Sequence, residues 1–422
     1  MPAVIFAAHV FYGAAVNAPA LILFACLFAI LIGTLISPGA RRDLDRLSPF
    51  GTLFGLFTAV VLVAVFSLTP WVPGGSQPIW EWSAGMPSST INRSATAVEI
   101  LKLLGLTVPF LIGCVYGART GSARRLYAVV LCTGAVYALF NLVVFLGQGG
   151  VNTSGSRLSG GFDSANVAGT VFGILIVMSI AWLFGSWSRL ERQSVADRLT
   201  ATAPLVALVL LFLACLLLTA SRGALGATCL ALALFSGWVS LDSRRVRWPM
   251  IAMGAGIIVV ATVVYTQGNT LFVDRFEQFA EDSSRGDLLG PHWRAFLHAP
   301  LFGYGLGTYP EVNNQIMTSQ NVEALSETVV LHNVYVQWLE EAGIVGAAPM
   351  FLVLVVILGA TTWRAVSRER NRTLVVGLLA ASLLVLAHSS VEVSLNTPSF
   401  CALWSLLLGL GFAMSQATMR SA

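Results

Sequence analysis

Apolar stretches of about 20 residues recur along the whole chain, and they limit what it can fold into more than any other feature. A helix of about 20 apolar residues is long enough to cross a hydrocarbon core of about 30 Å. Only 10% of the 422 residues are charged, against about 25% in soluble globular proteins. We therefore predict an all-α polytopic membrane protein.

The apolar pattern predicts about twelve transmembrane helices. They are expected at residues 3–17, 19–37, 51–70, 97–117, 125–147, 166–187, 202–219, 223–241, 248–265, 343–363, 373–391 and 396–415. This divides the chain into a first helical part (1–265), a long loop (266–342) and a second helical part (343–422). The N-terminus lacks the positive start and the cleavage site of a secretory signal, so we expect it to be retained.

The cations alternate between the predicted connections. One set of alternate loops holds 17 of the 24 Lys and Arg residues: Arg41, Arg42, Arg46, Arg119, Arg124, Arg125, Arg189, Arg192, Arg198, Arg244, Arg245, Arg247, Arg364, Arg368, Arg370, Arg372 and Arg420. The opposite set holds Arg93, Arg157, Arg222, Arg275, Arg285 and Arg294. Since positive loops stay in the cytoplasm, the loop at 266–342 is expected on the outer side. Both termini are then cytoplasmic, provided that the segment 3–17 spans.

The long outer loop is too polar to span and too long for a passive connection. It contains an acidic stretch, a short aromatic helix pattern at 292–298, a glycine-rich turn at 300–307 and a second helix pattern at 331–342. The acidic residues lack the tight Asp-x-Asp spacing of a calcium loop, and no cysteine belongs to a CxxC pair. We therefore predict no metal site and no cofactor, and nothing indicates a nucleic-acid partner.

Arginine is scarce on the outer side, so Arg222, Arg157, Arg285 and Arg294 are candidates for binding an anion. Arg222 lies in a turn between two apolar helices, where a charge is costly and usually has a partner. It can snorkel to lipid phosphates, or it can bind a phosphate together with the free N–H groups of the following helix. Arg157 and Arg285 can instead be solvated loop charges, and an interfacial structural role is favoured for Arg294.

Further polar residues have structural alternatives. His332, at the start of a helix pattern, suits general acid–base chemistry or simple capping; His292 and His298 are weaker candidates. Glu99 and Lys102 are three residues apart in an apolar span, and we expect an intramembrane ion pair. His388 and Glu392 are one turn apart and are interpreted as a structural polar pair.

Two ordered motif sets resemble the O-antigen ligase and polymerase superfamily. The first is Arg285, Trp293-Arg294 and Pro300-Leu301-Phe302-Gly303-Tyr304-Gly305-Leu306-Gly307, followed by His332-Asn333 and a helix through Gly343. The second comprises Ser221-Arg222-Gly223 and the stretch from Arg157 through Gly160-Gly161-Phe162 to Asn166. These motifs cover about a quarter of the chain, and the predicted topology extends the resemblance over all of it.

The resemblance implies a GT-C-like membrane glycosyltransferase of the bacterial inner membrane, with its active site on the periplasmic side. Such an enzyme takes an O-antigen glycan from undecaprenyl pyrophosphate and passes it to the lipid A–core of lipopolysaccharide, without metal or nucleotide. Arg222 and Arg285 would bind the pyrophosphate, and His332 would activate the acceptor hydroxyl. Arg157, Asn166, Arg294 and Asn333 would be donor-site residues. Either Arg285 or Arg294 can occupy the family's catalytic arginine position.

Two other functions stay open at this point. An O-antigen polymerase uses the same donor chemistry with another lipid-linked repeat as the acceptor. A secondary transporter would use Glu99, Lys102 and His388 as a polar site near the midplane, although no interrupted helix pair or repeated half supports it. The sequence does not distinguish the glycan, the stereochemical outcome or the oligomeric state.

Overall fold

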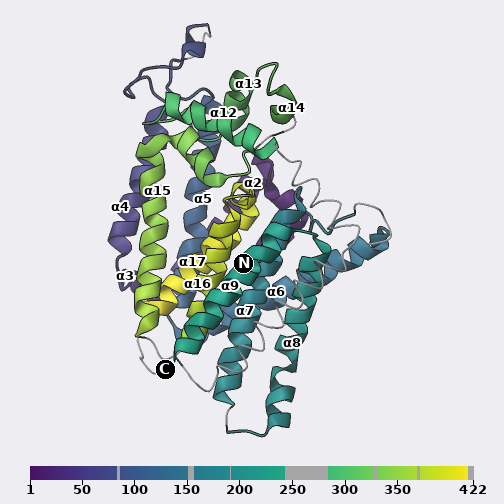
Figure 1. Ribbon diagram of the computed structural model, residues 1–422. Helices are drawn as coiled ribbons and strands as arrows, with labels where there is room; N and C mark the ends of the chain where they lie inside the picture. The colour runs from purple at the N-terminus through teal and green to yellow at the C-terminus, as the bar shows by residue number, and fades with distance from the viewer. Residues whose placement is uncertain are drawn as a thin grey trace.

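The computed structural model is a bundle of long helices with a small helical cap at one end (Figure 1). It describes residues 1–82, 86–150, 156–190, 192–242, 284–326, 328, 330–367 and 371–416, with the backbone alone at 241–242 and 284–287. We use the name cap for residues 284–333, which contain α12 (Ser284–His298), α13 (Tyr309–Ile316) and α14 (Val322–Leu325). The predicted span at 248–265 lies outside the described residues.

Within the described residues, nine helices are long and apolar enough to cross a membrane, so the protein is an integral membrane protein. They are α2 (Asn17–Leu35), α4 (Phe50–Ser67), α5 (Arg93–Gly117), α6 (Thr120–Gly147), α7 (Ala165–Arg189), α8 (Val195–Leu218), α9 (Arg222–Asp242), α15 (Val334–Val366) and α17 (Pro398–Gln416). A tenth apolar helix, α16 (Arg372–His388), is slightly shorter. Each corresponds to a predicted span, and the all-α fold class is confirmed.

The first predicted span is wrong in length. Residues 3–17 were expected to cross the membrane, but α1 (Pro2–Val10) has only nine residues and is followed by the short helix η1 (Tyr12–Ala14). Nine residues extend about 14 Å, which is about half of a bilayer core. Gly13 has φ 64° and lies against Phe162 and Thr397, where a side chain would collide. The expected cytoplasmic position of the N-terminus therefore loses its support.

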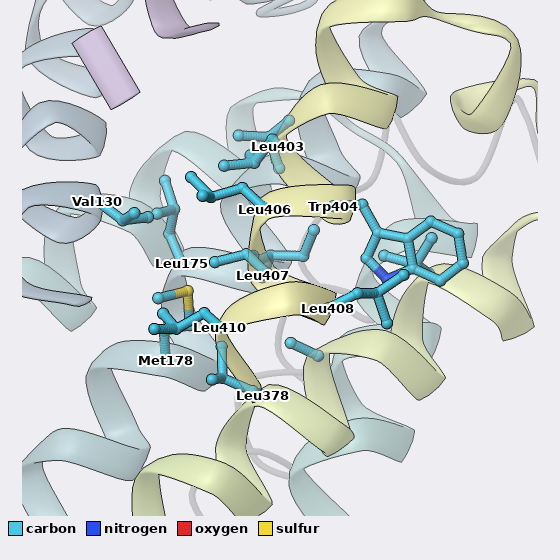
Figure 2. Packing of buried hydrophobic residues seen from close by; sticks show 14 of the residues in the cluster. Val130, Leu175, Met178, Leu378, Leu403, Trp404, Leu406, Leu407, Leu408 and Leu410 are labelled. Atoms are coloured by element: carbon cyan, nitrogen blue, oxygen red, sulfur yellow. The ribbon is translucent and has the colours of Figure 1, made fainter. Parts of the chain in front are cut away.

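The core of the bundle is built on two helices, α17 and α7, which are almost entirely enclosed. Figure 2 shows Leu403, Leu406 and Leu410 of α17 packing toward Leu175 and Met178 of α7. α5 also lies along α17: a Cβ at Gly409 would stand 2.1 Å from the Phe110 carbonyl oxygen. Small residues are what allow membrane helices to approach so closely.

Loops that were predicted on the same side of the membrane lie at the same end of the bundle. Arg119, between α5 and α6, donates through Nε to Asp43 Oδ2 of α3 (Pro38–Asp45) at 2.8 Å. Arg124 of α6 lies over the Trp182 ring of α7 at 5.9 Å. These cation-rich connections are at the end of the bundle opposite the cap (Figure 1).

The cap is joined to α15 where that helix breaks at Gly343, which has φ 59° and ψ −177°. The break leaves backbone groups of α15 without partners inside the helix, and the turn at 300–307 supplies them. Ile344 N donates to Pro300 O at 2.8 Å and Val345 N to Leu301 O at 3.0 Å, while Tyr304 N and Gly305 N donate to the carbonyls of Glu340 and Glu341. These backbone groups therefore have partners outside the helix, as polar backbone groups away from water require.

Replacing Gly343 with alanine is expected to detach the turn from α15. A Cβ there would stand 2.3 Å from the Leu301 carbonyl, and such backbone angles cost a non-glycine residue roughly 1–3 kcal/mol even without a clash. Faster cleavage of the cap in limited proteolysis of the purified protein would report the detachment. Gly359→Ala is the matched control, since its Cβ would meet nothing within 4 Å. Equal cleavage of both variants would contradict the role given to Gly343.

Candidate active site

The turn between α8 and α9 places Arg222 at the cap end of the bundle. Ala220 adopts φ 48°, so the chain reverses between Leu218 and Arg222, and Ser221 Oγ accepts from Ala224 N at 3.3 Å. Arg222 is the first residue of α9 and is half-buried. The helix N-terminus adds its own partial positive charge beside the guanidinium. The local arrangement therefore suits an anion, as the sequence predicted.

Arg157 is held against this same turn. Its Nε donates to Thr219 O at 2.7 Å, and its Nη2 donates to Asn166 Oδ1 at 2.6 Å. Leu158 N donates to Leu218 O at 2.9 Å, so the segment before α7 follows the end of α8. Two arginines from separate predicted connections thus share one turn.

Asn166 connects Arg157 to a buried carboxylate. Its Nδ2 donates to Glu392 Oε2, and Glu392 also accepts from Ser164 Oγ at 3.5 Å and from Val393 N at 3.0 Å. Glu392 is 1% exposed. A buried carboxylate is costly unless hydrogen bonds surround it, and these three donors satisfy that requirement.

His332 lies on the other side of Glu392. Its Nδ1 is 3.8 Å from Glu392 Oε1, and this nitrogen is buried without a hydrogen bond. The side chain as a whole is 38% exposed, so its accessible surface belongs to the other ring atoms. Catalytic hydrogen bonds are often long before substrate binds and shorten in the complex. The arrangement is that of a histidine with a carboxylate behind it.

Asn333 fixes the backbone beside His332. Its Oδ1 accepts from Val336 N at 3.1 Å and caps α15. Val334 N donates to Ser389 O at 3.1 Å, which attaches this helix start to the end of α16. α16 also meets α9 there, because a Cβ at Gly223 would lie 2.6 Å from His388 Nε2. His388 Nδ1 is 2.8 Å from Thr170 Oγ1.

The structure therefore brings Arg157, Asn166, Arg222, His332 and Asn333 to one end of the bundle. The two remaining predicted site residues are on α12. Arg294 is exposed on α12, and Arg285 is in the first turn of α12 with its side chain outside the described part. Most of the acidic stretch also lies outside the described residues. Among the residues that are described, no cluster of three His, Cys, Asp or Glu side chains could coordinate a metal ion.

Glu392 has partners that sequence reasoning missed. It was interpreted only as one half of a structural polar pair with His388, but its carboxylate also accepts from Asn166 and Ser164 at the start of α7 and faces His332. The available signal was an acidic residue in a short connection on the side where His332 was expected. Glu99 and Lys102, by contrast, form the predicted ion pair at 2.6 Å.

A second cluster of buried polar side chains connects the cap to α15. His292 Nδ1 is 2.9 Å from Glu340 Oε1, with both side chains fully buried, and His292 Nε2 is 3.3 Å from Asn313 Oδ1. The Tyr309 ring stacks on His292 at 4.7 Å, and burial raises the pKa of Tyr309 to about 12. Beside it, Glu341 accepts from Gly307 N at 2.8 Å. His292 is thus a structural residue of the cap.

Residues 207–351 match the family described as O-antigen ligase. This part of the chain is similar to O-antigen ligases. The resemblance seen in the sequence is confirmed, and the domain indicates a membrane enzyme of the ligase or polymerase type. The match contains Arg222, the whole cap and His332, whereas Arg157, Asn166 and Glu392 lie outside it. A search of curated proteins found no match to the chain.

Proposed function

We propose that this protein transfers an O-antigen glycan from undecaprenyl pyrophosphate to the lipid A–core of lipopolysaccharide at the periplasmic face of the inner membrane. The observation that carries the proposal is the convergence of two arginines and a carboxylate-backed histidine at one end of the bundle, where Arg222 and His332 come from the part that matches O-antigen ligases. The cation-rich end opposite the cap supports a cytoplasmic position for that end. The active-site end then faces the periplasm.

The transfer needs a stabilised leaving group and a base. The acceptor hydroxyl oxygen attacks the anomeric carbon of the donor, and the bond from this carbon to the pyrophosphate oxygen breaks with its electron pair. Arg222, at the start of α9, would neutralise the charge that develops on the pyrophosphate, and Arg157 would hold the turn in place. Arginine suits this because it binds phosphate oxygens through two parallel hydrogen bonds.

His332 would accept the proton that the attacking hydroxyl loses. Glu392 would hold the imidazole from the Nδ1 side, which leaves Nε2 for the substrate. This division between base and orienting carboxylate recurs in enzymes that activate a hydroxyl group. Asn166 would in turn keep the Glu392 carboxylate in position, because it bonds both Glu392 and Arg157.

Replacing Arg222 with alanine is expected to lower the transfer rate by about 10²- to 10³-fold, as removal of one charge-stabilising donor does. The rate would be measured with purified protein in nanodiscs, supplied with a polyprenyl-pyrophosphate-linked oligosaccharide and lipopolysaccharide core. Arg222→Lys should restore part of the rate, since it keeps the charge but not the bidentate geometry. Arg42→Ala, exposed at the opposite end, is the control. Full activity of well-folded Arg222→Ala would remove Arg222 from the active site.

The choice between ligase and polymerase concerns the acceptor. Cells without a ligase should accumulate lipid-linked polymer and carry bare lipopolysaccharide core, whereas cells without a polymerase should carry core with single repeats. The family description favours the ligase. Complementation of a ligase-deficient strain, followed as lipopolysaccharide banding on a gel, would decide the question. A knockout in the source organism that leaves core with single repeats would overturn the ligase assignment.

A further inference from the structure

One buried imidazole beside the candidate active site has no part in the proposed chemistry. His388 is the last residue of α16 and is 3% exposed, and α16 packs on both α7 and α9 (Figure 1). His388 Nδ1 is 2.8 Å from Thr170 Oγ1 of α7, and the ring edge that carries Nε2 faces Gly223, the second residue of α9. The ring therefore lies between the two helices whose first turns carry Asn166 and Arg222.

The hydrogen bonds around Thr170 determine which nitrogen of His388 carries the proton. Thr170 Oγ1 has one proton, and it donates this proton to Asn166 O at 3.0 Å. The hydrogen bond between Thr170 and His388 Nδ1 is therefore donated by the imidazole. In the neutral ring this leaves a lone pair on Nε2, the nitrogen that faces the start of α9. Since the start of a helix carries a partial positive charge, an acceptor is the favourable group at this position.

The close approach at Gly223 makes the position of α9 sensitive to the size of its neighbour. A Cβ at Gly223 would stand 2.6 Å from His388 Nε2 and 3.0 Å from Cδ2, so an alanine would displace either the ring or the helix start. At Gly226, in the next turn of the same helix, a Cβ would meet nothing within 4 Å. Arg222 directly precedes Gly223, so a displaced helix start carries Arg222 with it.

The end of α16 also supports the start of α15. Ser389, the residue after His388, accepts from Val334 N through its carbonyl oxygen at 3.1 Å, and Val334 is two residues after His332. One short segment at the end of α16 thus contacts α7, α9 and α15, the three helices whose first turns carry the candidate site.

We propose that His388 is a positioning residue that fixes Arg222 relative to Asn166 and His332, an inference that rests on the proposed function. His388 acts through the backbone of α9, and its enclosed side chain does not reach the donor or the acceptor. The donor to Thr170 anchors the ring on α7, and the opposite edge of the ring sets where α9 begins. A group that is misplaced by about 1 Å can lower a reaction rate by about 10²-fold, so this contact controls how well Arg222 meets the leaving pyrophosphate.

Substitutions on both sides of the contact test whether His388 supports α9. Gly223→Ala is expected to slow glycan transfer by about 10- to 100-fold, because its Cβ displaces the helix start. Gly226→Ala is the matched control and should transfer glycan at the normal rate. His388→Asn keeps a donor for Thr170 but lacks the ring atoms that reach Gly223, so Gly223→Ala should cost no further activity in that background. Equal slowing by Gly223→Ala in both backgrounds would overturn the contact.

A second pair of variants tests whether His388 acts through Arg222. His388→Asn alone should slow transfer by about tenfold, because α9 loses its support. In the Arg222→Ala background the same substitution should have almost no effect, since the group that His388 positions is already absent. A general loss of folded structure would slow transfer in both backgrounds. A tenfold loss that persists without the Arg222 side chain would therefore overturn the positioning role.

Unfolding temperatures separate this inference from the proposed function, because they require no substrate. Gly223→Ala should lower the unfolding temperature in detergent when His388 is present and change it little in the His388→Asn background. Equal decreases in the two backgrounds would refute the contact, whether or not the protein transfers glycan. Absence of transfer by the unmodified protein would instead refute the proposed function, and with it the catalytic consequence of the contact.

Discussion

Alanine at position 332 is expected to slow glycan transfer by about 10²- to 10⁴-fold, the range that a positioned general acid–base contributes. In the proposed mechanism the acceptor hydroxyl would lose the group that takes its proton, while Arg157 and its hydrogen bond to the turn before α9 stay in place. Initial rates at saturating donor and acceptor, measured in nanodiscs, would report the effect as a fall in kcat.

His298→Ala is the matched control, because His298 is exposed at the end of α12, away from the buried face of the cap. Glu392→Gln adds a second comparison. It keeps the shape of the side chain but removes its charge, so the loss should be smaller than for His332→Ala. A His332→Ala variant that transfers glycan at nearly the normal rate, alongside an inactive Arg222→Ala variant, would show that another group accepts the proton.

Removal of the His292 side chain is expected to cost roughly 1–3 kcal/mol of stability, because it leaves the fully buried Glu340 side chain without its hydrogen-bond partner. The ring contact with Tyr309 would be lost as well. His292→Ala should therefore unfold at a clearly lower temperature than the unmodified protein when both are heated in detergent and followed by tryptophan fluorescence.

An exposed ion pair provides the comparison for His292. Arg119 is 60% exposed in its pair with Asp43, and such pairs contribute only about 0–1 kcal/mol. Arg119→Ala should therefore leave the unfolding temperature almost unchanged. Similar small shifts for both variants would mean that Glu340 finds other partners once His292 is gone.

Two properties of the sequence, its apolar runs and the positions of its arginines, allowed most of the fold to be predicted. Long apolar runs identify helices, and alternating cations place their ends, because both properties are local in the sequence. The same reasoning failed at 3–17, since an apolar run of that length does not reveal that Gly13 turns the chain after Val10. Gly13 also packs against Phe162 and Thr397, which are far away along the chain and which the run itself does not contain.

The candidate site was predictable where its residues carry a motif. Arg222, His332 and Asn333 were identified because they stand in the ordered motifs that resemble the superfamily. The relation of Glu392 to His332 was missed, because it spans 60 residues and depends on how α16 ends beside the start of α15.

The broken helix α15 has a consequence for how the protein is made. Its freed N–H groups at Ile344 and Val345 are satisfied only by carbonyls of the preceding turn, Pro300 and Leu301. The turn is translated before α15, and in the proposed orientation it lies on the far side of the membrane from the ribosome. In that orientation the stable insertion of α15 depends on prior translocation of the cap, and we expect a chain whose cap is delayed to expose polar backbone and become a target for membrane quality control.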